Sequence, residues 1–343
     1  MQHVVAHCGE RTDRIPTDVP AVSVPGVTRG PAVTSRPMSS GSAALRRYAP
    51  AAADALDAVV AATWTTAAVH GALGTVDRAA TRAGELLGTS PLASPVAFAH
   101  VDVDVDVDTG SRSEDGDRAV LGFAEQCVLD VSGVTSDQRS AFLAVGGRAS
   151  GDLAAALWVV DVVPRTRAAL DALFGAGPWP DPTTTTDLDL WATLDDLIRV
   201  VPALDALDPI TSELVRLRGA RQHNCRLCSS LRSRAALRAG ADERAFAAVD
   251  DYRHSDLAPL AIAALAFTDA MVWTPGRIDS SVVVDLQSEA APDQQVELVL
   301  DVTRNALNKI AVALGADAAH VEEGVEIYDV APDGSLVYGL EPD

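Results

Sequence analysis

The sequence predicts an all-α protein made of two tandem helical domains, residues 49–176 and 185–318. Long stretches rich in Ala, Leu and Val run without internal Gly or Pro, and dense Gly, Pro and Thr segments separate them. Two regions depart from this helical pattern. We expect residues 1–48 to be a disordered leader and residues 319–343 to form a small C-terminal hairpin.

The leader is rich in Pro, Ser, Thr, Gly and Val and has no helical period. Prolines recur in it too closely for a helix or a central strand: Pro16, Pro20, Pro25, Pro31 and Pro37. The helical pattern begins near Ala51. The helices expected in the first domain are 52–73, 76–87, 119–131, 136–145 and 150–174.

An acidic segment interrupts the first domain at residues 101–117. Valine and aspartate alternate strictly from Val101 to Asp108, a pattern typical of a half-buried strand. The spaced aspartates also suggest calcium, but an EF-hand loop needs Gly at its sixth position, and counted from Asp104 that position is Thr109. We therefore expect a solvated acidic loop or a short edge strand.

A break at Gly175–Pro182, followed by four threonines, marks the predicted boundary between the domains. Beyond it, Asp208 and Pro209 supply an N-cap and a proline at the first helical position. Asn224 is expected to cap a helix that carries two cysteines. The helices expected here are 187–200, 209–221, 225–240, 243–252, 257–272, 280–288 and 293–314. The strands expected in the hairpin are 325–328 and 335–338.

The two predicted domains look like copies of each other. The segment Arg78–Gly84 is nearly identical to Arg234–Gly240. The same alignment places Val69 and Ala72 opposite the two cysteines of the second copy. We interpret the chain as a tandem repeat whose first copy keeps the helices and lacks the thiols.

Cys225 and Cys228 form a CxxC motif, and Glu213 lies twelve residues before the first thiol. Residues i and i+3 of a helix share a face, with Cβ atoms about 5–6 Å apart, and a modest tightening of that geometry allows a disulfide. The pair could therefore cycle between dithiol and disulfide. The other two of the four cysteines, Cys8 and Cys127, have no obvious partner, so we expect no structural disulfide framework.

Thiol chemistry explains why these residue types would lie together. A thiol reacts as its thiolate, which a helix N-terminus stabilises, and Arg226 and Arg232 add positive charge. Attack on a peroxide gives a sulfenic acid, which a neighbouring thiol condenses to a disulfide. A carboxylate such as Glu213 could help to move the proton. The alternative is a pair of inert cysteines packed in a core.

A metal site is a further alternative, with His223 and the two cysteines as ligands. A structural zinc site usually takes four ligands from paired motifs, and the sequence has no second CxxC and no matching histidine pair. We therefore expect neither a metal nor a cofactor. His223 is then a loop histidine beside the thiols, with acid–base catalysis as the less favoured role.

The spacing of Glu213, the CxxC motif and the Ala-rich helix ending at Gly240 resembles the alkyl hydroperoxidase AhpD-like / carboxymuconolactone decarboxylase superfamily. The resemblance covers residues 185–318 well and 50–175 only as a degenerate copy. Three later features also fit the resemblance: Leu265–Ala270, Val296–Leu300, and the pair Asn305 and Asn308.

This resemblance implies an all-helical, oligomeric protein. It implies that Cys228 is the nucleophile that attacks a peroxide, that Cys225 resolves the product to a disulfide, and that Glu213 relays a proton. One position departs from the family pattern: the peroxidases usually carry His four residues after the second Cys, and here that residue is Arg232. Either Arg232 replaces the histidine by lowering the thiol pKa, or peroxidase activity is weak or absent.

Composition limits the partners. The net charge of −21 repels nucleic-acid phosphates and anionic membranes, so we expect neither as a partner. No apolar run approaches the length of a membrane span, and the N-terminus has no secretory pattern, so we expect a cytoplasmic protein.

The favoured function is a thiol-dependent peroxidase or disulfide oxidoreductase that acts on a small hydroperoxide or disulfide with an unknown thiol reductant. One alternative is a non-catalytic helical oligomer or ligand-binding protein derived from that family. The other is a decarboxylase-like lyase, which rests on family analogy alone. In each case we expect a homo-oligomer, a dimer or trimer of tandem chains.

Overall fold

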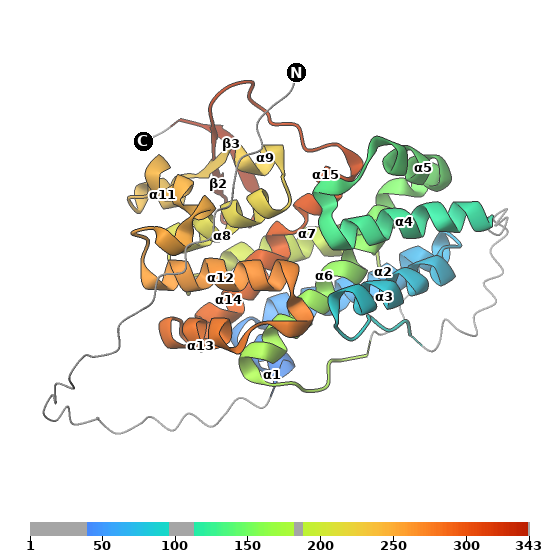
Figure 1. Cartoon of the computed structure of the whole chain (residues 1–343), viewed down its shortest axis with the longest axis horizontal. Coiled ribbons are helices and arrows are strands. Elements are labelled where there is room, and N and C mark those ends of the chain that lie inside the picture. The colour runs from blue at the N-terminus through green and yellow to red at the C-terminus, as the bar shows by residue number, and fades with distance from the viewer. Residues whose placement is uncertain (1–39, 96–112, 182–187, 342–343) are drawn as a thin grey trace, which may run out of the picture. The chain divides into compact units, whose positions relative to one another are not determined.

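The computed structural model describes residues 40–95, 113–181 and 188–341, and it is mostly helical, as predicted (Figure 1). The helices of the first half are α1 (Gly41–Tyr48), α2 (Pro50–Val69), α3 (Leu73–Leu87), α4 (Glu114–Asp130), α5 (Ser136–Gly146) and α6 (Ser150–Phe174). Those of the second half are α7 (Leu190–Val200), α8 (Pro209–Gln222), α9 (Arg226–Ser229), α10 (Arg234–Arg238), α11 (Glu243–Ala247), α12 (Pro259–Trp273), α13 (Ser280–Glu289), α14 (Pro292–Asn305) and α15 (Asn308–Leu314).

The first helix begins earlier than the sequence predicts. Residues 1–39 of the expected leader lie outside the described residues, but α1 already covers the eight residues to Tyr48. The Ser40 hydroxyl accepts a hydrogen bond from the Ala43 amide at 3.2 Å and so caps the helix, and Ala44 and Leu45 are buried. The proline-rich composition upstream hid this local N-cap signal, and the boundary at residue 48 was wrong.

The acidic segment is described only at its end. The Val-Asp alternation and the calcium alternative fall on residues 96–112, outside the described residues. From Glu114 the segment is the first turn of α4, capped by the Ser113 hydroxyl, which accepts from the Gly116 amide. Acidic side chains are favourable at this position because the N-terminal end of the helix dipole is positive.

The predicted domain boundary falls between α6 and α7, yet the described residues on both sides share one core. Helix α7 packs against α2, and α14 packs against α6. The Trp158 indole donates to the Ala306 carbonyl at 2.8 Å, and the Thr166 hydroxyl bonds that of Thr303 at 2.7 Å. Both α2 and α6 are apolar around most of their circumference, so each must be covered on several sides. The tandem-repeat interpretation stays a prediction.

The C-terminal hairpin is confirmed, and it belongs to a sheet that the sequence did not predict. Strands β2 (Glu326–Val330) and β3 (Leu336–Leu340) pair antiparallel, and β1 (Leu231–Ser233) adds to β2 in parallel. The expected helix 225–240 is therefore broken into α9, β1 and α10. The hairpin consequently lies beside the CxxC turn (Figure 1).

A second helix is also split. The expected helix 293–314 is α14 and α15, with a break at Ala306 and Leu307. Asn305 and Asn308 flank this break, and both line the same cavity beside the thiols. The two asparagines therefore lie at the candidate site.

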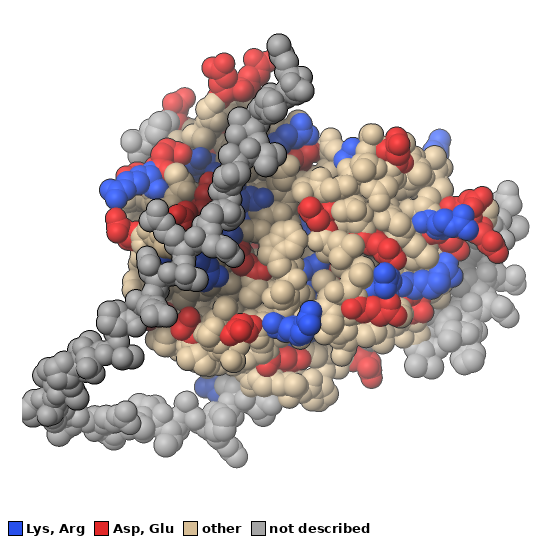
Figure 2. Space-filling view, in the orientation of Figure 1, with Lys and Arg blue, Asp and Glu red and all other residues tan. Residues whose placement is uncertain are grey.

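One described segment, Ser136–Phe174, is apolar and long enough to cross a membrane by length and composition. Half of its most apolar window, 50%, is buried inside the protein, as expected for the core helix α6. Acidic and basic side chains are interspersed over the face drawn in Figure 2, so the negative net charge does not gather into one acidic patch on that face.

Candidate functional site

The CxxC turn lies between α8 and β1. Asn224 adopts a left-handed conformation, with φ of 51°, and turns the chain so that Cys225 becomes the N-cap of α9. The Cys225 Sγ accepts a hydrogen bond from the Cys228 amide at 3.2 Å. Cys225 is 1% exposed, whereas Cys228 is only half-buried, and both are free thiols. The two thiols therefore lie close together with unequal access to solvent.

Cys228 borders a cavity of about 200 Å³ between α7, α8, α9, the α14–α15 break and the hairpin. Its wall is mainly apolar. The residues that line it are Ile198, Arg216, Leu227, Cys228, Leu231, Arg304, Asn305, Leu307, Asn308, Tyr328, Leu336 and Tyr338. A small molecule in this cavity would reach Cys228 but not the buried Cys225.

The surroundings of the two thiols separate their acidities. A hydrogen bond from the Cys225 thiol lowers the pKa of Cys228 to about 7, against the effect of burial and with help from the positive charge of Arg216 and a hydrogen bond from Asn308. The same bond and burial raise the pKa of Cys225 well above its usual range. Cys228 is therefore the thiolate of the pair near neutral pH.

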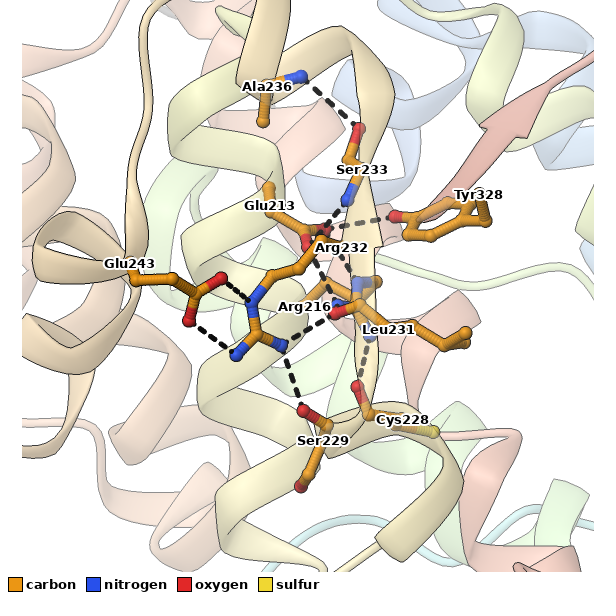
Figure 3. Close-up of polar contacts among 10 residues, drawn as sticks. All are labelled: Glu213, Arg216, Cys228, Ser229, Leu231, Arg232, Ser233, Ala236, Glu243 and Tyr328. Carbon is orange, nitrogen blue, oxygen red and sulfur yellow. Dashed lines mark hydrogen bonds and ion pairs between the residues drawn. The ribbon is translucent and has the colours of Figure 1, made fainter. Parts of the chain in front are cut away.

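Arg216 is the arginine whose charge lowers the pKa of Cys228, and it was not among the residues predicted from the sequence. Its Nη1 donates to the Cys228 carbonyl and its Nη2 to the Leu231 carbonyl, each at 2.8 Å (Figure 3). The guanidinium also lies over the ring of Tyr328, 5.2 Å from its centre. Its position three residues after Glu213, one turn along the same helix, is the signal that could have found it.

Glu213 is buried at 2% exposure, and four donors occupy its carboxylate. Oε1 accepts from Arg216 Nη2 at 2.7 Å and from the Ser233 amide at 3.0 Å. Oε2 accepts from Arg216 Nε at 2.6 Å and from the Tyr328 hydroxyl at 2.9 Å (Figure 3). Among the described residues, neither sulfur forms a hydrogen bond with it. Glu213 thus fastens α8, β1 and β2 together, and it reaches the thiols only through Arg216.

The structure places Arg232 in an ion pair with Glu243, and among the described residues it forms no hydrogen bond with either sulfur. It is 6% exposed, and its guanidinium pairs with Glu243 at 2.8 and 2.9 Å. It also donates to the carbonyls of Ser229 and Leu231, at 2.9 and 2.8 Å, and lies over the Phe246 ring. Because β1 interrupts the expected helix, Arg232 does not follow the cysteines on one helical face. It clamps the turn after them (Figure 3).

Arg226 is likewise paired with a carboxylate. Its guanidinium binds Asp317 at 2.7 and 3.2 Å, and its own backbone amide donates to the same carboxylate at 2.9 Å. The Leu227 amide donates to the Asp317 carbonyl at 2.9 Å. Asp317 therefore anchors the start of α9, and its negative charge opposes ionisation of Cys228.

His223 is buried and contacts Asn308, a residue of the cavity wall. Its Nδ1 lies 2.7 Å from Oδ1 of Asn308, the residue that also bonds Cys228. Burial lowers the pKa of His223 to about 3, so the ring is neutral at physiological pH and Nδ1–H is the donor to the Asn308 carbonyl oxygen. This bond turns the amide nitrogen of Asn308 towards Cys228. His223 is therefore suited to hold Asn308 in place.

A larger cavity, about 650 Å³, is lined by α6 and by the three segments that follow α3, α6 and α12, with Arg167, Asp171 and Trp179 among its residues. It has no cysteine in its lining. Among the described residues, no group of three or more His, Cys, Asp or Glu is placed to hold a metal ion. The smaller cavity is the better candidate because it holds the thiol with the lowered pKa.

Fold and site define a mostly helical protein in which a CxxC pair borders a small cavity. Two similar proteins are known from Mycobacterium tuberculosis: uncharacterized protein Rv2313c of strain ATCC 25618 / H37Rv and uncharacterized protein MT2376 of strain CDC 1551 / Oshkosh. Each is 42% identical over 231 residues, which cover 64% of this chain and 80% of the relative. The chain belongs to the family of these mycobacterial proteins. No family model and no solved structure matches it.

Proposed function

We propose that this protein is a thiol-dependent peroxidase or disulfide oxidoreductase with Cys228 as nucleophile and Cys225 as resolving thiol. One observation carries the proposal: the half-buried thiol on the cavity wall has a pKa of about 7, and the sulfur of a second cysteine lies against its amide. A thiol with this pKa is about half ionised at neutral pH, which suits a nucleophile.

With a hydroperoxide, the Cys228 thiolate attacks one oxygen of the O–O bond. The S–O bond forms, the O–O bond breaks, and the leaving alkoxide takes a proton from water in the open cavity. The Cys225 thiol then attacks the sulfenic sulfur, so that an S–S bond forms and water leaves. A thiol reductant returns both cysteines to the reduced state in two exchange steps.

With a disulfide substrate, the first step is thiol–disulfide exchange at Cys228, which releases one thiol. Cys225 then displaces the second thiol and leaves the same Cys225–Cys228 disulfide. Both reactions remove two electrons from the pair. Arg216 and Asn308 favour the thiolate in each, and Glu213 holds Arg216 in position. The buried, fully occupied carboxylate of Glu213 supports this positioning role better than proton relay.

The remaining parts of the proposal follow the sequence. The substrate is a small hydroperoxide or disulfide, the reductant is a thiol, the location is the cytoplasm, and the protein is a homo-oligomer of two or three chains. Its substrate must be small because the cavity measures only about 200 Å³.

The test is a thiol count. Reduced protein treated with one equivalent of a small alkyl hydroperoxide or disulfide should lose two of its four thiols, and peptide mapping should find a Cys225–Cys228 disulfide. Cys228→Ser should lose this response, whereas Cys127→Ser should keep it. Unchanged thiol counts in the wild-type protein with both classes of oxidant would overturn the proposal in favour of a non-catalytic ligand-binding protein.

A further inference from the structure

Arg304 is the one described arginine on the cavity wall that has no anionic partner within ion-pair distance. It lies in the last turn of α14, and its Nε donates to the Ile198 carbonyl at 3.1 Å. Within the described residues, its Nη1 and Nη2 have no hydrogen bond or ion pair. Arg216 on the same cavity differs, because Glu213 and two carbonyls occupy its guanidinium.

The charges around the cavity compensate Arg304 only in part. Among the described residues, no aspartate or glutamate lines the cavity. Asp301, one turn earlier on α14, attracts Arg304 without reaching ion-pair distance. Burial lowers the pKa of Arg304, and the nearby charge of Arg216 acts in the same direction. An arginine keeps its proton in proteins, so this wall carries a partly desolvated cation.

The rest of the cavity suits a hydrocarbon chain. Leu227, Leu231 and Leu336 are among the side chains that line it, and Cys228 lies on the same surface. A planar guanidinium with two free nitrogens matches the two oxygens of a carboxylate. A ligand with an anionic head at Arg304 and a short apolar body would therefore fill the cavity against the reactive thiol.

Resting on the proposed function, we propose that Arg304 binds the carboxylate of the substrate, which is a small organic acid carrying a hydroperoxide or disulfide group. The carboxylate takes the two free Nη positions, and the apolar part lies along the leucines. This places the oxidising group at Cys228. The preference for an anionic ligand is confined to the cavity, because the chain carries a net charge of −21 and its overall field does not attract anions.

A protection experiment tests the subsite without relying on catalysis. Reduced protein is labelled at pH 7 with neutral iodoacetamide, and the rate at Cys228 is followed by peptide mass spectrometry. At a concentration that saturates the site with hexanoate, hexanoate should slow this rate about tenfold, and the same concentration of hexanamide, which has the same shape without the charge, less than about twofold. In Arg304→Gln the two compounds should protect equally weakly, and Arg304→Lys should keep part of the preference.

Arg226→Gln is the matched control, because it removes an arginine near the thiols that pairs with Asp317 and lies outside the cavity lining. It should keep the hexanoate preference. Equal protection by hexanoate and hexanamide in the wild-type protein would overturn the carboxylate subsite, and this comparison needs no variant to fold. An unchanged preference for hexanoate over hexanamide in Arg304→Gln would also overturn the subsite.

The two proposals fail separately. Oxidation by 3,3′-dithiodipropionate should be about tenfold faster than by its diamide, and Arg304→Gln should remove the difference. Wild-type protein that is protected by hexanoate but loses no thiols to any oxidant would keep the subsite and reject the enzyme. Thiol loss at equal rates with both disulfides would keep the enzyme and reject the subsite.

Discussion

Two regions of the molecule hold a thiol near a basic side chain, and only one makes it reactive. Around Cys228, Cys225 and Arg216 lower the thiol pKa to about 7. Around Cys127, burial raises the pKa to about 12, although Lys309, the only lysine of the chain, lies nearby. A positive charge close to a sulfur is thus not sufficient.

The two regions differ in the groups that surround the thiol and the nearby cation. Lys309 is bound to Asp161, which also holds Arg165 at 2.8 Å, and the negative charge of Asp161 raises the pKa of Cys127 against the effect of Lys309. The cavity beside Cys127 measures only about 20 Å³, roughly the room for one water, and neither of the other two described cysteines bonds the thiol. Arg216 is also paired, but Cys228 has a thiol donor and a cavity open to small molecules.

The largest expected effect is the contrast in thiol reactivity. At pH 7 about half of Cys228 is thiolate, against about one molecule in 10⁵ of Cys127. Because the lowered pKa favours the anion, iodoacetamide labelling of Cys228 should fall below pH 7 and level off above it. Cys127 should be labelled far more slowly at pH 7, because its raised pKa leaves little thiolate. Peptide mass spectrometry from pH 5 to pH 10 measures both, and comparable rates at pH 7 would remove the distinction.

The second prediction compares the buried carboxylates of the two regions. Glu213→Gln and Asp161→Asn each leave buried cations without a full partner, so each should lower the free energy of unfolding by about 3–5 kcal/mol. The measurement is urea denaturation monitored by circular dichroism. Surface carboxylates such as Asp115, paired with Arg118 at 88% exposure, should cost far less when replaced.

The local response should tell these two variants apart. Glu213 holds the Ser233 amide and the Tyr328 hydroxyl, so Glu213→Gln should speed amide hydrogen exchange in β1 and β2. Asp161→Asn should instead speed exchange in α6 and α15. Faster exchange in the same segments for both variants would mean that the regions are not independent.

Part of this site follows from sequence because its signals are local. The CxxC spacing, the Asp208 cap and the alternating hairpin strands each depend on a few neighbouring residues. Local signals could not show that Arg216, rather than Arg232, is the arginine that acts on Cys228. The answer depends on where the chain leaves the helix. That point is set by β2, which pairs with β1 from far along the chain and brings Tyr328 to Glu213.

The smallest predicted effect concerns Asn308, which the sequence offered only as part of a family pattern. Its amide bonds Cys228, so Asn308→Ala should raise the pKa of Cys228 by roughly one unit, the lower end of what a single hydrogen bond to a charged group contributes. Labelling by iodoacetamide at pH 6 should slow accordingly and recover above pH 8. Asn305→Ala is the matched control because Asn305 lines the same cavity without contributing to the pKa of Cys228.

His223 separates the two ways in which Asn308 could act. If the amide works only because the His223 ring holds its oxygen, His223→Phe should raise the pKa of Cys228 about as much as Asn308→Ala, and the double variant should add little. Additive shifts in the double variant would mean that the histidine acts on the thiol by another route. Cys127 should show no change in any of these variants, because its low reactivity follows from burial rather than from a missing hydrogen bond.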